Sequence, residues 1–368
     1  MRSDFLKKIY QRQIILFNII FLLFFLYLFL VSLELMGASL KMFGGGLAES
    51  LIATTTNPLV GLFIGILSTS IIQSSSSTTS IVVGLVAGGA LNVANAIPIV
   101  MGANIGTSVT NLLVSLSQIR RNLEFRRALS AAIVHDFFNI LAVIILFPLQ
   151  YFTNFLGYAS AFIGEKFQNL GGLNFLSPVK HLTKPPVKIL ANWIGDYPWI
   201  LLGLSLVLLL LSLTRMVKAL KILVVKKAEA WFDLYLFKNA GRAFLVGMLL
   251  TAMVQSSSIT TSLAVPMAGA GVLTLAQIFP YTLGANVGTT VTAFLAALVT
   301  GNLSAIIVAF SHFLFNASGI LIFWPLKFIP IGLAEKFSAI AVRKKYIAIL
   351  YIIVVFFLVP VLLITILR

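Results

Sequence analysis

The chain has 368 residues, of which 60% are hydrophobic and 10% are charged, and its formal net charge is +16. A soluble domain carries about 25% charged residues, so this composition excludes a soluble enzyme, a nucleic-acid-binding domain and a disordered chain. The 26 Lys and Arg residues form short clusters between long apolar segments, as in the cytoplasmic loops of membrane proteins. We therefore predict an all-α, multi-pass membrane protein that has a lipid bilayer as its environment and no nucleic-acid partner.

The first predicted element is a transmembrane helix from Ile14 to about Leu33, preceded by four basic residues within positions 1–13. About 20 apolar residues span the hydrocarbon core of a bilayer. The segment is longer than the apolar part of a signal peptide and lacks a small-residue cleavage site, so we expect the helix to be retained. Its basic flank places the N-terminus in the cytoplasm.

Two segments of the chain repeat one another at an offset of 182 residues. Positions 61–116 and 243–298 are identical at 24 of 56 aligned positions. Both contain the motif QSSS, followed 29 residues later by G-A-N-[IV]-G-T. A third match, HDFFN at 135–139 against HFLFN at 312–316, follows in the same order. The chain therefore contains two internal repeats.

Four clusters of Lys and Arg, at 1–13, 120–127, 215–242 and 336–345, determine the predicted orientation of the helices. Such clusters lie on the cytoplasmic side of a membrane. If each QSSS motif is the tip of a re-entrant hairpin, this placement requires the second repeat to be inverted relative to the first and puts the C-terminus outside. Inverted repeats are typical of secondary transporters, whose sites form where the two halves meet.

The domain boundaries follow from the repeat and from this orientation. A segment rich in Gly, Pro and Asn, with widely spaced Lys residues, is predicted to be an external loop. The predicted parts are an N-terminal transmembrane helix and connector (1–56), the first repeat (57–155), the external loop (156–196), a transmembrane helix and basic cytoplasmic segment (197–242), the second repeat (243–329), and a basic linker with a C-terminal transmembrane helix (330–368).

Four segments are predicted to break helices at membrane depth, namely Gln73–Ser77, Gly102–Gly106, Gln255–Ser258 and Gly284–Gly288. The second and fourth would make each G-A-N-[IV]-G-T helix a broken transmembrane helix, although helix packing alone would also explain their glycines. A break at that depth persists only where protein or a water-filled cavity surrounds it. It exposes N–H groups that suit an anion, beside neutral oxygens that suit a small cation. We predict one central site with both kinds of group.

The predicted site has no Arg or Lys to neutralise an anion, because the arginines are confined to the basic loops. A bound Na⁺ would supply that charge and couple uptake of the anion to the sodium gradient. Asp136 is the acidic residue that lies clearly within an apolar segment. It is either functional, as ionisable groups in membranes often are, or part of a structural salt bridge. His135 and His312 are interpreted as helix-packing donors.

No enzyme and no catalytic residue are predicted, since the chain lacks GxSxG, HExxH and a nucleotide-binding lysine motif. It has no Cys, which excludes disulfides and thiolate metal sites. The alternatives are a sodium-coupled carrier for another small oxyanion or organic anion and, less favoured, an intramembrane hydrolase in which His135 or Asp136 activates a serine of Ser74–Ser77. No cofactor is predicted, and Na⁺ is the coupling ion.

The paired motifs, together with FRRALSAAIVHDFFN at 125–139, closely resemble the type II sodium-dependent phosphate cotransporters over roughly residues 55–360. The resemblance implies a secondary active transporter in the cell membrane that carries inorganic phosphate into the cell with Na⁺ by alternating access. The chain departs from the animal members because the segment 156–196 contains no Cys for their disulfide.

The resemblance also implies which residues bind the two ions. It places phosphate at the serines of both QSSS motifs and Na⁺ at a set in the second repeat, and repeat symmetry gives a related Na⁺ set in the first. We add the Asn of each G-A-N motif. The predicted phosphate ligands are Ser74, Ser75, Ser76, Asn104, Ser256, Ser257, Ser258 and Asn286. The predicted Na⁺ ligands are Gln73, Ser74, Thr107, Thr110, Gln255, Ser256, Thr289 and Thr292.

Overall fold

The computed structural model describes residues 2–43, 49, 52–169, 177–194, 197–231, 237 and 239–367. Within these residues the regular elements are all helices and no strand occurs. Seven of the described helices are long and apolar enough to cross a membrane, and three shorter apolar helices accompany them. The prediction of an all-α protein with several membrane helices is therefore confirmed.

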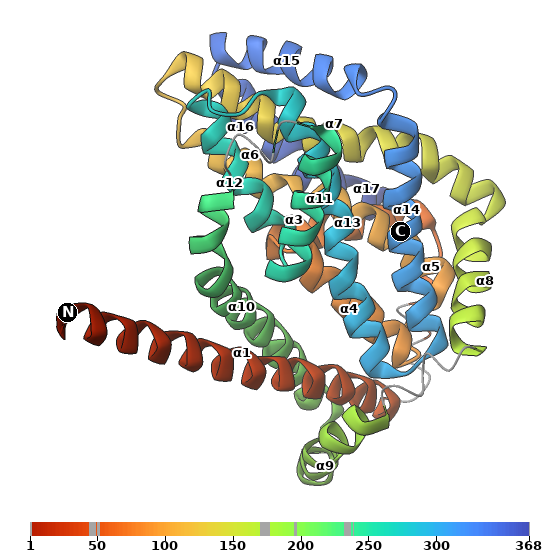
Figure 1. Ribbon diagram of the computed structural model, residues 1–368. Coiled ribbons are helices and arrows are strands. Elements are labelled where there is room, and N and C mark those ends of the chain that lie inside the picture. Colours follow the sequence, from red (N-terminus) through yellow and green to blue (C-terminus); the bar gives the residue numbers. More distant parts are fainter. Residues whose placement is uncertain are drawn as a thin grey trace.

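A long N-terminal helix precedes the helices of the first repeat (Figure 1). Its outer side chains include Leu16 and Phe17, which are 60% and 65% exposed, as expected where a helix faces lipid. Polar caps set the helix starts that follow: Asn57 accepts from the amide of Leu59, and Asn92 from that of Asn95. These helices are α1 (Arg2–Met42), α3 (Pro58–Ile72), α4 (Ser75–Ala87), α5 (Val93–Gly106), α6 (Ser108–Leu116) and α7 (Asn122–Thr153).

The second repeat and the C-terminal part form another run of helices. Asn239 and Asn302 cap two of them, and Thr274 forms a capping box with Gln277 at the start of a third. The helices are α11 (Ala240–Val254), α12 (Ser257–Gly269), α13 (Leu275–Thr300), α14 (Leu303–Phe323), α15 (Phe328–Arg343), α16 (Tyr346–Ile353), a π-helical turn η2 (Val354–Leu358) and α17 (Val359–Leu367).

The segment 156–196, predicted to be an external loop, is mostly helical where the structure describes it. It contains most of α8 (Phe155–Asn169) and all of α9 (Ser177–Ile194), and α10 (Pro198–Trp231) follows. Packing explains the difference. Apolar side chains of α9 pack against α1 and α10, and Phe167 of α8 meets Phe310 of α14 with ring centroids 6.0 Å apart. The Gly and Pro content of this segment therefore did not indicate its helices, and its external location stays a prediction.

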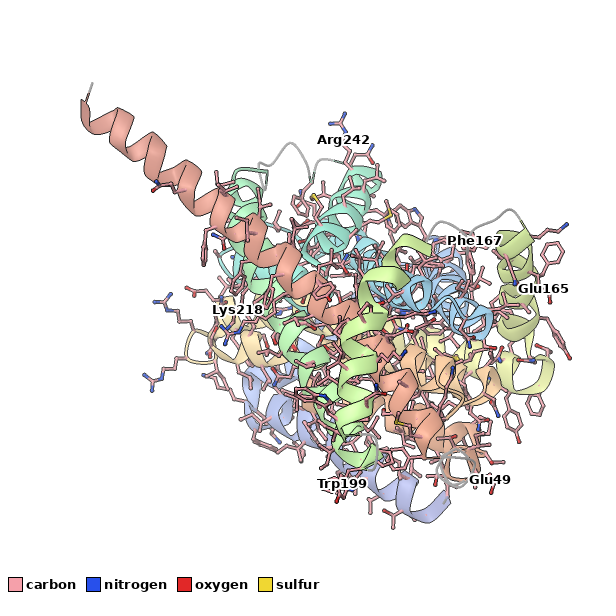
Figure 2. All side chains as sticks on the ribbon, turned by 90° about the horizontal axis from the view of Figure 1, so that it is seen from below. Glu49, Glu165, Phe167, Trp199, Lys218 and Arg242 are labelled. Atoms are coloured by element: carbon pink, nitrogen blue, oxygen red, sulfur yellow. The ribbon has the colours of Figure 1, made fainter. Side chains whose placement is uncertain are left out.

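A second difference concerns the predicted basic linker that begins at residue 330. Most of it forms α15, which crosses one end of the bundle (Figure 1). Ser338 of α15 bonds Ser130 of α7 at 2.5 Å, and Ala334 and Ala341 are fully buried. The helix has basic residues on its outer face and buried apolar residues on the face toward the bundle. The basic residues indicated a linker, and this amphipathic pattern was not predicted from the sequence. Basic and acidic side chains such as Arg242 and Glu165 lie at the outside of the molecule (Figure 2).

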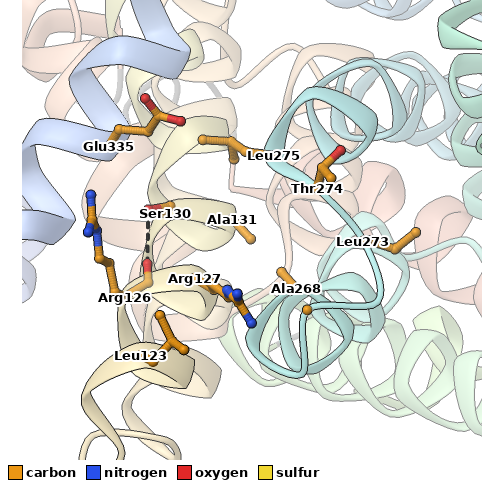
Figure 3. Close-up of a pocket in the computed structure, with 11 residues that line it drawn as sticks. Leu123, Arg126, Arg127, Ser130, Ala131, Ala268, Leu273, Thr274, Leu275 and Glu335 are labelled. Carbon is orange, nitrogen blue, oxygen red and sulfur yellow. Dashed lines mark hydrogen bonds between the residues drawn. The ribbon is translucent and has the colours of Figure 1, made fainter.

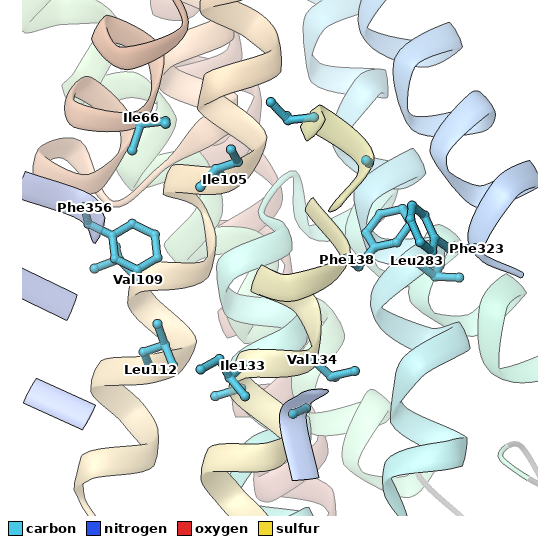
Figure 4. Close-up of a cluster of buried hydrophobic side chains, with 14 of the residues drawn as sticks. Ile66, Ile105, Val109, Leu112, Ile133, Val134, Phe138, Leu283, Phe323 and Phe356 are labelled. Carbon is cyan, nitrogen blue, oxygen red and sulfur yellow. The ribbon is translucent and has the colours of Figure 1, made fainter. Parts of the chain in front are cut away.

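The main hydrophobic core surrounds α7. Ile133, Val134 and Phe138 of this helix are buried between neighbouring helices (Figure 4). Phe138 meets Phe279 and Phe323 edge to face, with centroids 6.2 and 6.0 Å apart. Because α7 contacts helices of both repeats, its polar residues lie where the two halves of the molecule join.

Candidate anion and cation site between the repeats

The first QSSS motif breaks the chain between α3 and α4. Gln73 has φ 57° and ψ 29°, in the left-handed region, and its amide bonds the carbonyl of Thr69 at 2.7 Å. A residue other than Gly in this region costs about 1–3 kcal/mol and often lies at a functional site. Ser74 is extended and caps α4, accepting from the amide of Ser77 at 3.2 Å. The predicted helix break is confirmed.

The second QSSS motif adopts the same geometry between α11 and α12. Gln255 has φ 58° and ψ 26°, and its amide bonds the carbonyl of Thr251 at 2.7 Å. Ser256 is extended and accepts from the amide of Ile259 at 3.3 Å. Both predicted serine breaks are therefore present, and they agree within a few degrees.

The two breaks face one another across the interface between the repeats. Ser76 donates to the carbonyl of Gln255 at 3.1 Å, and Ser258 donates to the carbonyl of Gln73 at 3.4 Å. Ser258 is the repeat equivalent of Ser76, and Gln255 is the repeat equivalent of Gln73, at the offset of 182 residues. The two hydrogen bonds are therefore equivalent to one another. The chain thus brings both motifs into one place, with a local two-fold relation between their contacts.

The contact between the breaks places two helix N-termini together. The first amides of a helix have no carbonyl partner one turn earlier, and the helix dipole adds partial positive charge there. The serines that begin α4 and α12 are almost fully buried, with exposures of 3% for Ser75 and Ser76 and 2% for Ser257. Buried amides and hydroxyls at a helix N-terminus suit an anion such as phosphate without a fixed cationic side chain.

The two G-A-N-[IV]-G-T segments correct the sequence prediction. The helix α13 runs unbroken from Leu275 to Thr300, so the predicted break at Gly284–Gly288 is wrong. In the first repeat the interruption is a single residue, Thr107, whose φ of −59° and ψ of −33° are helical. Neither segment is the wide break predicted.

Close helix packing explains these glycines. A Cβ at Gly102 would overlap the carbonyl oxygen of Leu62 in α3, and a Cβ at Gly284 would overlap that of Phe244 in α11. Their neighbours Gly65 and Gly247 meet the facing helix in the same way. Small residues let membrane helices approach backbone to backbone, so the packing explanation left open by the sequence applies here.

The Asn residues of these segments join a buried polar network centred on His135 of α7. Asn111 donates to Nδ1 of His135 at 3.3 Å, which leaves Nε2 to donate to Oδ1 of Asn286 at 2.6 Å. Asn286 then donates to Oδ1 of Asn139, and Asn139 donates to the carbonyl of Asn104, each at 2.8 Å. Both polar atoms of the Asn286 side chain are used by protein partners in this conformation.

Several predicted Na⁺ ligands have buried oxygen atoms without a hydrogen-bond partner. They include Oε1 of Gln255 and the hydroxyls of Thr110 and Thr292. The hydroxyls of Thr107 and Thr289 instead bond carbonyls of their own helices at 3.0 Å. Buried oxygens without partners are costly, and a hard cation would satisfy them.

Sequence reasoning missed one residue of this oxygen set and the polar network around it. Thr251 has a buried hydroxyl without a partner and lies one helical turn before Gln255. The spacing T-x-x-x-Q, present in both repeats, was a usable signal. Thr261, which donates to Asn111 at 2.9 Å, and Asn139 could not be assigned in this way, because their roles depend on contacts between distant helices.

A cavity of about 330 Å³ lies elsewhere, between α7, α15 and the turn from α12 to α13 (Figure 3). Arg126 and Arg127 line it together with Glu335. It adjoins the C-terminal end of α12, whereas Ser257 begins this helix. At a rise of 1.5 Å per residue the two ends of α12 lie roughly 20 Å apart. This cavity is therefore separate from the serine motifs.

Comparison of the sequence with known proteins finds one matching family and several relatives. Residues 28–176 and 208–335 match the family described as Na⁺/Pi-cotransporter. The chain is 34% identical to the human sodium-dependent phosphate transport protein 2B over 448 aligned residues, covering 93% of this chain and 64% of that protein. It is 32% identical to the mouse sodium-dependent phosphate transport protein 2A, covering 96% of this chain and 68% of that protein. No solved structure matches the chain.

Proposed function

Because the chain belongs to the Na⁺/Pi-cotransporter family, we propose that it carries inorganic phosphate into the cell by symport with Na⁺. The family is described as Na⁺/Pi-cotransporters, which supports a transporter rather than an enzyme. The chain spans about 64% of the length of the first relatives, the 2B proteins of orangutan and human. Activity, substrate and ion coupling therefore belong to the proposal.

The reciprocal contact of the two QSSS breaks is the observation that carries the proposal. Two buried helix N-termini meet there, and the serines of both repeats contribute to one place. Phosphate would bind the hydroxyls and amides of Ser74–Ser76 and Ser256–Ser258. Asn104 and Asn286 are proposed to bind phosphate together with these serines. For this, Asn286 would break its present hydrogen bonds to protein groups.

Sodium is proposed to bind the oxygens beside this anion. In the second repeat the set is Gln255, Ser256, Thr289 and Thr292, and we extend it by Thr251. In the first repeat the set is Gln73, Ser74, Thr107 and Thr110. Each Na⁺ would offset one negative charge of phosphate in a region where a bare anion is expensive. The hydroxyls of Thr107 and Thr289 would turn away from their present carbonyl partners to reach the ion.

The proposed mechanism is alternating access between inverted repeats, 57–155 and 243–329, each with a re-entrant hairpin at its QSSS motif. The equivalent glutamines support it: Gln73 is exposed, whereas Gln255 is 8% exposed and buried. Equivalent positions thus differ in exposure, as expected of a carrier in which one side is open. The basic clusters support a cytoplasmic N-terminus and an external C-terminus in this proposal.

Uptake of labelled phosphate into proteoliposomes tests the proposal. With an inward Na⁺ gradient the chain should accumulate phosphate, and replacing Na⁺ by choline should reduce uptake to the level of empty vesicles. Sulfate, arsenate and succinate are then added as competitors. Uptake that is unchanged in choline would refute sodium coupling, and stronger competition by sulfate or succinate than by phosphate would favour a carrier for another anion.

A further inference from the structure

The cavity of about 330 Å³ between α7, α15 and the turn from α12 to α13 has no role in the proposed transport site (Figure 3). Arg126 and Arg127 of α7 and Glu335 of α15 line it, and all three side chains are exposed. At the start of α7, Arg121 and Glu124 form an ion pair at 3.0 Å, whereas these three charges form none within the described part of the chain. The cavity therefore presents two cationic groups and one carboxylate to a ligand.

The two guanidinium groups lie on different sides of the cavity. A Cβ at Gly271 would overlap Nη1 of Arg127, so this guanidinium lies against the turn that follows α12. Arg126 lies on the side of α15, the helix that carries Glu335 (Figure 3). A planar guanidinium offers several N–H donors, and pairs of them match two oxygens of a phosphate. Two arginines in one cavity are thus suited to a phosphate group held between them.

Glu335 determines which kind of phosphate compound fits the cavity. A carboxylate repels a free phosphate ion, because like charges at short range are unfavourable. A ligand that carries both a phosphate and an ammonium group instead gives every one of its charges an opposite partner. The phosphate would lie between Arg126 and Arg127, and the ammonium beside Glu335. The headgroup of phosphatidylethanolamine has this combination of charges.

The surroundings of the cavity favour a membrane lipid over a soluble phosphate ester. Leu123, which lines the cavity, is 60% exposed, and Val272 in the adjoining turn is 47% exposed. The helix α15 carries further exposed apolar side chains, including Ile340. Apolar groups beside basic ones are typical of a membrane interface. The basic clusters at 120–127 and 336–345 predict that this end of the bundle lies at the cytoplasmic leaflet.

We infer that this cavity binds the headgroup of an amine-bearing phospholipid of the cytoplasmic leaflet. The bound lipid would connect α7 and α15 to the turn between α12 and α13, with its acyl chains along the exposed apolar side chains. The second repeat has no equivalent site, because Leu303 and Ser304 stand at the positions of Arg126 and Arg127 when 135–139 is aligned with 312–316. The inference does not require that the chain transports phosphate.

Lipid binding by the full chain, purified in detergent and freed of lipid, tests the inference. Its unfolding temperature is recorded against dioctanoyl phosphatidylethanolamine, and against phosphatidylglycerol and phosphatidylcholine with the same acyl chains. Phosphatidylethanolamine should bind most tightly, because its ammonium alone can donate hydrogen bonds to Glu335. Arg126→Gln should raise its half-saturating concentration by about tenfold or more, as removal of a charged hydrogen-bonding partner usually does. Arg121→Gln, an exposed arginine outside the cavity, is the matched control and should leave the titration unchanged.

Two further variants assign the two charged parts of the headgroup. Arg127→Gln should weaken binding of phosphatidylethanolamine as Arg126→Gln does, and Arg126→Gln alone decides the test if Arg127→Gln does not fold. Glu335→Gln should abolish the preference for phosphatidylethanolamine over phosphatidylglycerol. Equal binding of the three lipids by the wild type, or a wild-type lipid titration in Arg126→Gln, overturns the inference.

Inorganic phosphate distinguishes this cavity from the proposed transport site. Phosphate bound at the serine motifs should stabilise the wild type and Arg126→Gln at the same concentrations. If Arg126→Gln instead shifts the phosphate titration and no lipid stabilises the wild type, the cavity holds free phosphate and the lipid assignment is wrong. If the lipid titrations are as expected but the wild type takes up no phosphate, the lipid site stands and the proposed function fails.

Discussion

The two repeats share the helix breaks at their QSSS motifs but differ in how their buried polar side chains are satisfied. In the first repeat His135 bonds Asn111 and Asn286. In the second, both ring nitrogens of the equivalent His312 are buried without partners. The hydroxyls of the equivalent threonines also differ: that of Thr69 bonds Thr78 at 3.0 Å, and that of Thr251 has no partner.

These differences show that repeated sequence does not enforce repeated contacts. Asn286 lies within reach of His135 and Asn139, but its counterpart Asn104 uses its side-chain amide on the carbonyl of Val100 in its own helix. Asn316, the counterpart of Asn139, has an oxygen without a partner. The second repeat thus holds only part of an equivalent network, His312 and Asn316, in an unformed arrangement, and Ala293 stands at the position of Asn111.

The largest effect is expected at the glycines, where the two repeats behave alike. Gly284→Ala places a Cβ against the carbonyl of Phe244, and Gly102→Ala places one against that of Leu62. Because both contacts are with backbone, the helices must move apart, at a cost of about 3 kcal/mol each. Thermal unfolding in detergent should show similar large losses for the two variants.

Gly203 of α10 is the matched control for this comparison. A Cβ there meets no atom within 4 Å, so Gly203→Ala should leave the protein equally or slightly more stable. If Gly284→Ala and Gly102→Ala also unfold at the wild-type temperature, then these glycines do not serve helix packing, and the wider breaks predicted from the sequence regain support.

The histidines test the difference between the repeats. His135→Leu removes partners from Asn111 and Asn286, and leaving buried amides unpaired costs about 2 kcal/mol. His312→Leu removes a ring whose nitrogens have no partners, so the stability of this conformation should be unchanged or higher. We expect a lower unfolding temperature for His135→Leu alone, measured in the same detergent.

Phosphate uptake sharpens the histidine comparison. If His312 gains partners in the opposite state, His312→Leu should slow uptake by several fold although the protein is as stable as the wild type. Equal loss of stability in both variants would mean that the asymmetry between the repeats is not a property of the folded protein in solution.

The sequence predicted the parts of the fold that depend on local pattern. Twenty-residue apolar segments predicted the membrane helices, and the repeated Gln-Ser-Ser-Ser predicted both breaks, because serine is a favoured N-cap residue. Local pattern failed for Gly284, since glycine is equally suited to a break and to close packing, and only the facing helix decides between them.

The polar network around His135 was beyond sequence reasoning for a different reason. Its members come from α5, α6, α7, α12 and α13, and each was interpretable alone as a helix-packing residue. The sequence did mark Asp136 as unusual, because an acidic residue in an apolar segment is costly wherever it lies. It did not identify Tyr351, 215 residues away, as its partner.

The smallest effect is expected at the paired threonines. Thr69→Val removes the bond to Thr78, which keeps its own bond to the Ser74 carbonyl, so the cost should be about 1 kcal/mol. Thr251→Val has the same shape and removes no bond. In choline it should therefore unfold at the wild-type temperature or slightly above, and Thr69→Val slightly below.

Adding Na⁺ should reverse the order of the two threonine variants. If the Thr251 hydroxyl is a ligand beside Gln255, wild-type protein and Thr69→Val gain stability from Na⁺ at similar concentrations, whereas Thr251→Val needs several times more. If the Thr251 hydroxyl only lacks a hydrogen bond and does not bind Na⁺, Thr251→Val should instead follow the wild-type Na⁺ titration. The comparison thus decides whether the unsatisfied oxygens of the second repeat are cation ligands or merely unfilled hydrogen bonds, using a single methyl-for-hydroxyl change in each repeat.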